Sequence, residues 1–296
     1  MIVVTTPTGN IGRQVLANLL RDGEAVRVIV RDPSRLPGQV RDRVEVVRGS
    51  HGDADVVNEA FDGAAAVFWL VPPDPKAEDL KATYLEFTQP ACDAFLRHQV
   101  QRVVGVSALG RGTAPALAGN AGLVSLSLAM DDLIAATGVS YRSLALPSFM
   151  ENMLRQAAVI RGQGVFFLPL DGDRRLRACA TRDIAAVASR LLSDASWSGQ
   201  ESVAVLGPED LSANDMARIM SEVLDRPIRF QQLTEEEFRA TLASQGQSQA
   251  MIEGMVDMMR AKNSGLDNAE PRTPESSSPT SFQRWCEEVL RPAVLG

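Results

Sequence analysis

The chain of 296 residues contains few histidines and cysteines, and this scarcity excludes several kinds of chemistry. The three cysteines, Cys92, Cys179 and Cys286, lie far apart, so their spacing favours neither a zinc knuckle nor a redox pair. The two histidines, His51 and His98, have no plausible nucleophile or carboxylate cluster beside them in the sequence. We therefore expect no metal site and no catalytic triad, and a sparse, odd set of cysteines is typical of a reducing compartment.

The sequence also has no apolar run near the roughly 20 residues that span a bilayer. The first ten residues contain no basic segment and no small-residue cleavage site, which predicts a first strand instead of a signal peptide. A net charge of -7 and a pI near 5.1 argue against binding to nucleic-acid phosphates. We expect a cytoplasmic protein without a membrane or nucleic-acid partner. Whether it is a monomer or a dimer stays open.

Short β-rich runs alternate with amphipathic stretches in the first half of the chain. This alternation predicts a Rossmann-type α/β fold, a doubly wound parallel sheet covered by helices on both faces. The expected strands are 1–5, 25–30, 43–48, 64–71, 101–107 and 139–146, and the expected helices between them are 11–21, 53–63, 78–98 and a helix ending at Thr137.

The second half is less regular. We predict helices near 150–161 and over 181–193, 212–224, 234–262 and 281–290, with strands at 202–206 and 227–232. These patterns suggest a dinucleotide-binding domain over residues 1–146, which the segment near 177–206 rejoins. Residues 147–296 then form a smaller, mostly helical substrate-binding α/β region.

The most informative segment is the loop 6–12, TPTGNIG, between the first strand and the first helix. A loop that binds a dinucleotide must turn tightly and let backbone amides approach the pyrophosphate at a helix N-terminus. Gly9 suits the close approach and Gly12 suits helix–strand packing, whereas Thr6 replaces the usual first glycine. The alternative interpretation is an ordinary strand-to-helix turn that needs small residues.

Arg31 ends the second strand, where NAD-specific proteins usually carry an acidic residue. A guanidinium there can clamp the 2′-phosphate of NADP(H), which a carboxylate would repel. The alternative is a solvated surface arginine. Asp32, the next residue, could bond a ribose hydroxyl and so permit NAD(H).

With this loop and Arg31, the chain resembles the NmrA-like branch of the atypical short-chain dehydrogenase/reductases. Further motifs that carry the resemblance are Arg31-Asp32-Pro33, Ala60-Phe61-Asp62-Gly63, Val106-Ser107-Ala108-Leu109-Gly110, Thr137-Gly138-Val139, Pro147-Ser148-Phe149-Met150-Glu151-Asn152, Arg182-Asp183-Ile184-Ala185, Leu206-Gly207-Pro208-Glu209 and Pro271-Arg272-Thr273-Pro274. The branch includes quinone- and isoflavone-reductase-like enzymes and redox-sensing regulators, so the resemblance implies a nicotinamide cofactor.

The resemblance places cofactor contacts at the ends of successive strands. It implies that the glycine loop lines the pyrophosphate, that Ser50 and His51 flank the adenine, and that Val71 and Pro72 lie along the ribose. The expected cofactor-binding residues are Thr6, Thr8, Gly9, Asn10, Ile11, Gly12, Arg31, Ser50, His51, Val71, Pro72, Ser107, Ala108 and Pro147.

Many short-chain reductases use a Tyr-x-x-x-Lys pair, and this sequence has none. Neither Tyr84 nor Tyr141 has a lysine four residues later, and Ser127 stands where some NmrA-like reductases keep a lysine. Ser107 and Asn152 are the candidate catalytic residues, since both can donate a hydrogen bond to a carbonyl. The alternative is that Ser107 closes the sheet end and Asn152 caps a helix.

An apolar set is expected near the substrate cleft, and a methionine-rich segment runs from Met251 to Met259. Methionine-rich helices fill cores, but they also shape adaptable binding surfaces. If this helix covers the cleft, the substrate is a flat hydrophobic molecule such as a quinone or an aromatic polyketide. The expected substrate-contacting residues are Trp69, Phe149, Met150, Met153, Phe166 and Phe167.

We therefore predict an NADP(H)-dependent oxidoreductase that reduces a hydrophobic carbonyl, quinone or activated double bond. Hydride transfer needs no protein acid in principle, because the nicotinamide carries the chemistry. The first alternative is a non-catalytic sensor of the NADP⁺/NADPH ratio, which the missing Tyr-x-x-x-Lys pair favours. The second is a non-redox enzyme built on the same scaffold.

Overall fold

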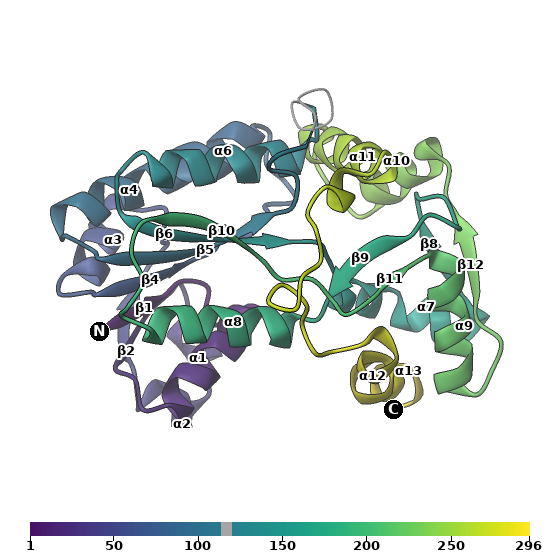
Figure 1. Ribbon diagram of the computed structural model, residues 1–296, viewed down its shortest axis with the longest axis horizontal. Helices are drawn as coiled ribbons and strands as arrows, with labels where there is room; N and C mark the ends of the chain where they lie inside the picture. Colours follow the sequence, from purple (N-terminus) through teal and green to yellow (C-terminus); the bar gives the residue numbers. More distant parts are fainter. Residues whose placement is uncertain (114–119) are drawn as a thin grey trace.

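A seven-stranded parallel sheet forms the larger part of the computed structural model, which describes residues 1–113 and 120–296 (Figure 1). The strand order is β10-β6-β5-β4-β1-β2-β3, and every neighbouring pair is parallel. The predicted doubly wound α/β fold is confirmed. The strands are β1 Ile2–Val4, β2 Val26–Val30, β3 Glu45–Arg48, β4 Ala66–Trp69, β5 Arg102–Ala108, β6 Ser140–Leu146 and β10 Gln200–Ala204.

Helices cover both faces of this sheet, as Figure 1 shows. Alternate residues of a strand point to opposite faces, so β4 sends Ala66 and Phe68 to one core, and Val67 and Trp69 to the other. This two-sided burial explains why the strand is apolar throughout. The helices of the first face are α1 Gly12–Arg21 and α8 Thr181–Ser193; those of the second are α3 Ala54–Phe61, α4 Phe87–Arg97, preceded by the π-helical turn η2 Ala82–Glu86, and α6 Leu123–Ala135.

Two side chains attach α8 to the rest of the molecule. Gln14 Nε2 in α1 donates to Thr181 Oγ1 at 2.9 Å, and Glu151 Oε2 accepts from the Thr181 amide at 3.0 Å. The following strand, β10, then pairs with β6, two residues earlier than the predicted 202–206. The segment after residue 177 therefore supplies a helix and a strand to the main sheet.

The remaining elements form two small sheets and several helices. Strands β7 Ser148–Phe149, β9 Leu176–Cys179 and β11 Asp210–Leu211 make one sheet, and β8 Val165–Leu168 pairs with β12 Arg229–Gln232. The sequence pattern did not predict β7, β9 and β11, because two to four residues are too few for a readable alternation. The helical elements here are η3 Met150–Gln156, α7 Ala157–Gln163, α9 Ala213–Leu224, α10 Glu235–Ser244, α11 Gln249–Asn263, η4 Leu266–Asn268, α12 Phe282–Trp285, η5 Cys286–Leu290 and α13 Arg291–Leu295.

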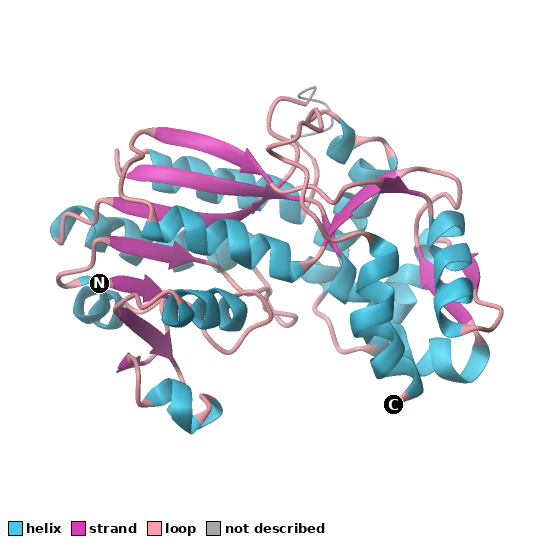
Figure 2. Cartoon of the chain, turned by 60° about the horizontal axis from the view of Figure 1, so that its bottom comes forward, coloured by secondary structure: helices cyan, strands magenta, loops and turns pink. Residues whose placement is uncertain are grey.

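The carboxyl ends of the main strands point toward this second group of elements (Figure 2). A third core of the molecule lies within that group and includes Met150, Phe166 and Trp285. The expected domain boundary between residues 146 and 147 stays a prediction. Two short helical elements, η1 Pro33–Arg35 and α2 Gly38–Arg41, connect β2 to β3.

Candidate functional site

The carboxyl edge of the main sheet collects the residues that the sequence singled out. Strand order reverses at β1, which has β2 on one side and β4 on the other. In open α/β sheets, ligands bind outside the carboxyl ends of the strands at such a reversal point. The expected cofactor residues follow β1 (6–12), β2 (Arg31), β3 (Ser50, His51), β4 (Val71, Pro72) and β6 (Pro147), or end β5 (Ser107, Ala108).

Gly9 and Gly12 of the glycine loop differ in how much space a side chain would have. A Cβ atom at Gly12 would lie 2.1 Å from the carbonyl oxygen of Thr6, so no side chain fits between helix and loop. A Cβ atom at Gly9 would lie 3.4 Å from the same oxygen, an ordinary contact. Gly9 is exposed. Packing therefore requires Gly12, whereas Gly9 leaves open surface that a ligand can approach.

Thr6 occupies the place of the missing first glycine and adopts its conformation. Its φ of 52° lies in the left-handed region, which is rare for a β-branched residue. Its Oγ1 is buried and has no hydrogen-bond partner within the described residues. In the same part of the chain, the N-terminus of α1 has neither a side-chain cap nor an acidic residue in its first turn. A phosphate group fits these donors, because helix N-termini favour anions.

Arg31 lies exposed after β2, in the position that suits a 2′-phosphate. The neighbouring Asp32 carboxylate instead accepts hydrogen bonds from the Ser34 hydroxyl at 2.7 Å and the Ser34 amide at 3.0 Å. These hydrogen bonds lower the pKa of Asp32 below its ordinary value. Asp32 therefore caps a local turn, and Arg31 keeps an exposed guanidinium.

His51 is enclosed by aromatic side chains. Its ring meets Trp69 edge-on at 5.1 Å and Phe87 edge-on at 4.8 Å between centroids, and its Nε2 lies 3.0 Å from the Leu70 carbonyl oxygen. Burial lowers the pKa of His51 to about 4, so the ring is neutral and its Nε2–H donates to Leu70. His51 is only 7% exposed, so the adenine could contact only a small part of its surface.

The expected substrate residues lie in three different environments. Trp69 is fully buried beside Phe95, so it offers a substrate no exposed surface in this structure. Met150 and Met153 belong to the third core, together with Phe166. The half-buried aromatic side chains are Phe149 in β7 and Phe167 in β8. Phe149 is thus the aromatic residue of this set nearest in sequence to the end of β6.

The two candidate catalytic residues also differ in placement. Asn152 lies exposed on η3. Ser107 is buried near the end of β5, and its hydroxyl donates to Asp131 Oδ2 at 2.6 Å. Ser107 can therefore donate to a substrate carbonyl only if its hydroxyl rotates away from Asp131.

The Asp131 carboxylate in α6 accepts hydrogen bonds from three hydroxyl groups. Besides Ser107, Tyr141 donates to Oδ1 at 2.6 Å and Ser143 donates to Oδ2 at 3.0 Å. Burial raises the pKa of Asp131 despite these hydrogen bonds, and Arg111 at 3.6 Å opposes the rise. We call these four residues, Ser107, Asp131, Tyr141 and Ser143, the Asp131 hub. The sequence signal for it is an aspartate within the apolar helix 123–135, a position to which the motifs assigned no role.

Ser127 and Tyr84 meet at the position of the missing lysine. Ser127 Oγ donates to the Leu123 carbonyl oxygen at 3.1 Å and is hydrogen-bonded to the Tyr84 phenol. Burial raises the pKa of Tyr84, so the phenol stays protonated. A serine beside a tyrosine thus stands at the position where some NmrA-like reductases keep a lysine.

The methionine-rich helix α11 packs at the carboxyl edge of the sheet. A Cβ atom at Gly122, just before α6, would lie 2.0 Å from the Gly254 carbonyl oxygen in α11. Met258 packs in a cluster that includes Ala108, at the end of β5. Ser248, the N-cap of α11, holds the loop after β4 through hydrogen bonds to Pro75 and Ala77 carbonyl oxygens at 2.8 and 2.5 Å. The helix therefore lies beside the expected nicotinamide end.

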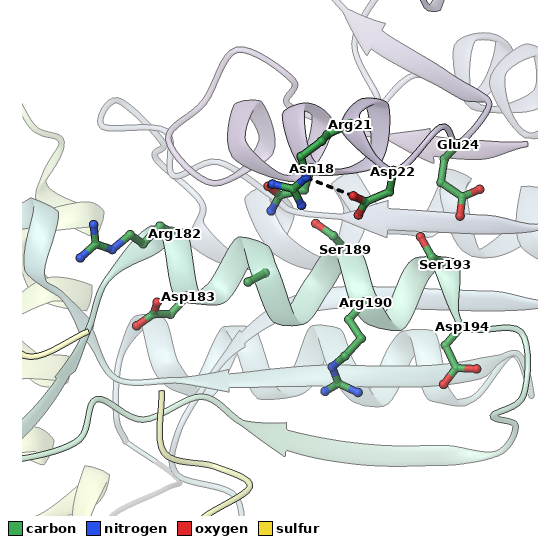
Figure 3. A pocket seen from close by; sticks show the side chains of 11 residues that line it. Asn18, Arg21, Asp22, Glu24, Arg182, Asp183, Ser189, Arg190, Ser193 and Asp194 are labelled. Atoms are coloured by element: carbon green, nitrogen blue, oxygen red, sulfur yellow. Dashed lines mark hydrogen bonds and ion pairs between the residues drawn. The ribbon is translucent and has the colours of Figure 1, made fainter. Parts of the chain in front are cut away.

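A polar groove lies elsewhere, between α1 and α8 (Figure 3). It is lined by charged side chains of both signs, and the ion pair Arg21–Asp22 joins two of them at 3.1 Å. Its α1 residues come from the last turn of the helix, away from the glycine loop. The groove is thus separate from the cofactor residues. The lining residues are Asn18, Arg21, Asp22, Glu24, Arg182, Asp183, Ala186, Ser189, Arg190, Ser193 and Asp194.

No helix in residues 1–113 and 120–296 has the length and apolarity that crossing a membrane requires. Among those same residues, no three His, Cys, Asp or Glu side chains are grouped so that they could hold a metal ion.

The parallel sheet, its reversal point and the glycine loop together define a dinucleotide-binding protein. A family model described as NAD(P)H-binding matches residues 7–195, and the chain belongs to this family. This result confirms the family relationship and the nicotinamide cofactor expected from the sequence.

Three similar proteins illustrate the family. The chain is 34% identical over 243 residues, 82% of its length and 80% of the relative, to a (4-alkanoyl-5-oxo-2,5-dihydrofuran-3-yl)methyl phosphate reductase of Streptomyces griseus. It is 26% identical over 261 residues, 87% and 86% of the two chains, to an NAD(P)H azoreductase of Xenophilus azovorans. The structure of an NADPH-dependent quinone oxidoreductase from Escherichia coli, complexed with NADPH, superposes with a TM-score of 0.76, covering 100% and 99% of the chains at 20% identity.

Proposed function

We propose that this chain transfers hydride from NADPH to a flat, hydrophobic acceptor, which is a quinone, an aromatic carbonyl compound or an activated double bond. The broader class is established: the chain is an NAD(P)H-dependent reductase, because it belongs to the NAD(P)H-binding family and its relatives are reductases. The proposal concerns the choice of cofactor, the class of acceptor and the residues that contact each.

The choice of NADPH rests on Arg31. Its exposed guanidinium follows β2, and the adjacent carboxylate of Asp32 is turned toward Ser34. A guanidinium binds a phosphate in bidentate fashion, whereas an acid would repel it. The pyrophosphate would be held by the loop 6–12, with the free Thr6 hydroxyl and the α1 amides as donors. When bound, the cofactor supplies the hydride.

The observation that carries the acceptor class is the position of α11. Met258 packs with Ala108 at the end of β5, so a methionine-bearing helix borders the expected nicotinamide end. Methionine side chains adapt to flat aromatic and quinone-like molecules because they are unbranched and polarizable. The relatives include an azoreductase and a quinone oxidoreductase, and the substrate name of the Streptomyces griseus relative describes an unsaturated ring with an oxo and an alkanoyl group.

Ser107 would orient the acceptor at the end of β5 after rotation of its hydroxyl. Asn152, exposed on η3, would add a second donor. Phe149, half-buried in β7, would border the acceptor. These roles follow from the placement of the residues at or after the carboxyl ends of β5 and β6.

The test is a reductase assay with matched acceptors. The protein is incubated with NADPH or NADH and a panel of quinones, aromatic ketones and unsaturated lactones, and the loss of absorbance of the reduced nicotinamide is followed. Turnover of flat hydrophobic acceptors with NADPH supports the proposal. Tight NADPH binding by calorimetry with no turnover of any acceptor contradicts it and favours the sensor alternative.

A further inference from the structure

Lys262, in the last turn of α11, and Asp267, in η4, form a buried ion pair. Lys262 Nζ lies 2.5 Å from Asp267 Oδ2, and the two side chains are 7% and 1% exposed. The other lysines of the chain, Lys76 and Lys81, are exposed. Removing two charges from water is unfavourable unless hydrogen bonds compensate fully. A buried lysine in a chain with only three lysines therefore needs a physical reason.

The hydrogen bonds of this pair are incomplete. Asp267 Oδ1 is buried and has no partner among the residues that the structure describes. An ammonium group has three N–H donors, and the hydrogen bond to Asp267 is the one that Lys262 makes within residues 1–113 and 120–296. Buried polar atoms in native proteins nearly always have partners. The pair can therefore form further hydrogen bonds with another polar group.

The pair lies beside the carboxyl end of β5. Leu266, next to Asp267, packs on Gly110: a Cβ atom at Gly110 would lie 3.2 Å from Leu266 Cδ1. Leu266 and Ala261, the neighbour of Lys262, share one cluster with Ala108. Since Ala108 ends β5, the residues next to the ion pair pack at the edge of the sheet where the nicotinamide is expected.

Its other side faces the strands that follow β6. The turn η4 contacts β9, which carries Cys179. Burial raises the pKa of the Cys179 thiol well above its ordinary value, and the charges of Glu151, Asp183, Lys262 and Asp267 also act on it. Cys179 is paired in register with Phe149 of β7. The residues and elements next to the ion pair therefore contact both the cluster of Ala108 and the strand that pairs with Phe149.

One further charge approaches from the turn between β8 and β9. A Cβ atom at Gly265 would lie 3.6 Å from Arg174 Nη1. The charged groups around Lys262 are therefore Asp267 from η4, Arg174 from this turn, and, near Cys179, Glu151 and Asp183. Arg260, on the same helix, instead points to Glu235 of α10 at 2.5 Å.

We propose that Lys262, held in place by Asp267, donates the proton to the reduced acceptor and so replaces the absent Tyr-x-x-x-Lys pair. This inference rests on the proposed reductase function. Hydride addition to the acceptor carbon moves the π electron pair of its carbonyl, or of the conjugated system, onto oxygen. The Lys262 ammonium transfers a proton to that oxygen and becomes a neutral amine. A proton from solvent then restores the ammonium.

A cation at this position also lowers the barrier to hydride transfer, before the proton is transferred. The positive charge stabilises the negative charge that develops on oxygen, and it does so most strongly in a site shielded from water. Asp267 keeps the flexible lysine side chain in one orientation, while its second oxygen stays available for a hydroxyl group of the acceptor. A purely structural ion pair would do neither.

The main test compares Lys262→Met with the double variant Lys262→Met/Asp267→Asn. The double variant leaves no unpaired buried carboxylate, so its stability should be reduced less than that of the single variant. Lys76→Met, at an exposed lysine, is the matched control. We expect both Lys262 variants to lose on the order of 100-fold in kcat, as removal of a general acid does, while the Kd for NADPH changes by less than about twofold. The control keeps wild-type kcat.

A second readout requires no turnover. A hydroxynaphthoquinone whose hydroxyl group is neutral in free solution at the assay pH absorbs differently when ionised, so its spectrum in the complex reports whether a cation faces its oxygen. We expect the wild-type complex with NADP⁺ to bind it as the anion, and both Lys262 variants to bind it weakly or as the neutral form.

The assignment is overturned if both Lys262 variants keep kcat within about twofold of wild type. It is equally overturned if wild type and variants give the same hydroxynaphthoquinone spectra, including no binding by either. If wild type binds NADPH but reduces no acceptor, the proposed function is contradicted, and the spectral titration still decides the role of Lys262. Failure of NADPH binding contradicts both.

Discussion

Tyr141 in β6 donates a 2.6 Å hydrogen bond to Asp131 in α6, through a space that only a glycine at position 105 leaves free. A Cβ atom at Gly105 would lie 2.2 Å from the Tyr141 hydroxyl oxygen. With Ser107 and Ser143, this contact ties β5 and β6 to the helix that covers them. The Asp131 hub therefore fixes the end of β5, where the acceptor is expected.

The hub predicts a pH dependence of stability. Because burial raises the pKa of Asp131 in the folded state, the folded chain binds its proton more tightly than the unfolded chain. Stabilisation by the protonated acid is complete below the ordinary pKa of 3.8 and is lost as pH rises through the folded-state pKa. Asp131→Asn cannot titrate. We expect the free energy of unfolding of wild type, relative to that of Asp131→Asn, to increase as the pH is lowered from 7 to 4. Denaturant titrations at each pH measure this difference. A difference independent of pH would contradict this.

Ser107→Ala and Ser143→Ala separate catalysis from stability. Each removes one hydrogen bond to the same carboxylate oxygen, so each should cost about 0.5–1.5 kcal/mol of stability. Only Ser107 lies at the end of β5, so Ser107→Ala should also lower kcat by at least about tenfold. The measurements are denaturant unfolding and the reductase assay. Equal kcat for the two variants would remove Ser107 from the catalytic group.

Gly9→Ala and Gly12→Ala distinguish cofactor contact from packing. The added methyl group at Gly12 collides with the Thr6 carbonyl, so Gly12→Ala should lose about 1–3 kcal/mol of stability or more. At Gly9 the methyl group fits, and Gly9→Ala should stay within about 0.5 kcal/mol of wild type. Calorimetry should nevertheless show weakened NADPH binding by Gly9→Ala, because the pyrophosphate approaches there. Unchanged affinity would place the pyrophosphate elsewhere.

Arg31→Ala tests the 2′-phosphate contact. Hydrogen bonds to charged groups contribute about 1.5–3 kcal/mol, so the Kd for NADPH should rise roughly 10- to 150-fold. Binding of NADH should be unchanged, because it lacks the 2′-phosphate. Arg21→Ala, at the far end of α1, serves as the control. Equal losses for both cofactors, measured by calorimetry, would mean that Arg31 has another role.

His51 predicts a loss of stability in mild acid. Its folded-state pKa of about 4 lies below the ordinary 6.5, because burial disfavours the charged ring. As pH falls below 6.5, His51 binds a proton in the unfolded chain but not in the folded chain, so the free energy of unfolding decreases. Between pH 7.5 and 4.5 this amounts to roughly 2–3 kcal/mol. Over the same range, His51→Gln should lose about 2–3 kcal/mol less stability than wild type, measured by denaturant unfolding.

Local patterns of the sequence predicted most of the main sheet. Each of its strands follows from a short apolar run, and α8 was predicted at its observed bounds, 181–193. The glycine loop and Arg31 could also be assigned roles, because both lie within one βαβ unit and their chemistry is local. By contrast, β7, β9 and β11 are stabilised by partners distant in the chain and have little pattern of their own.

The sequence alone thus determined the parallel Rossmann-type sheet, a glycine loop between the first strand and the first helix, and the absence of a Tyr-x-x-x-Lys pair, because periodicity and short motifs encode these features within a few residues. Only the tertiary structure decided that Asp131 joins three hydroxyl groups, that Trp69 is buried in the core, and that Ala261 and Leu266, the neighbours of Lys262 and Asp267, pack with Ala108 at the end of β5. Such contacts join residues far apart in the chain, and which partners meet depends on how the helices and the sheet pack.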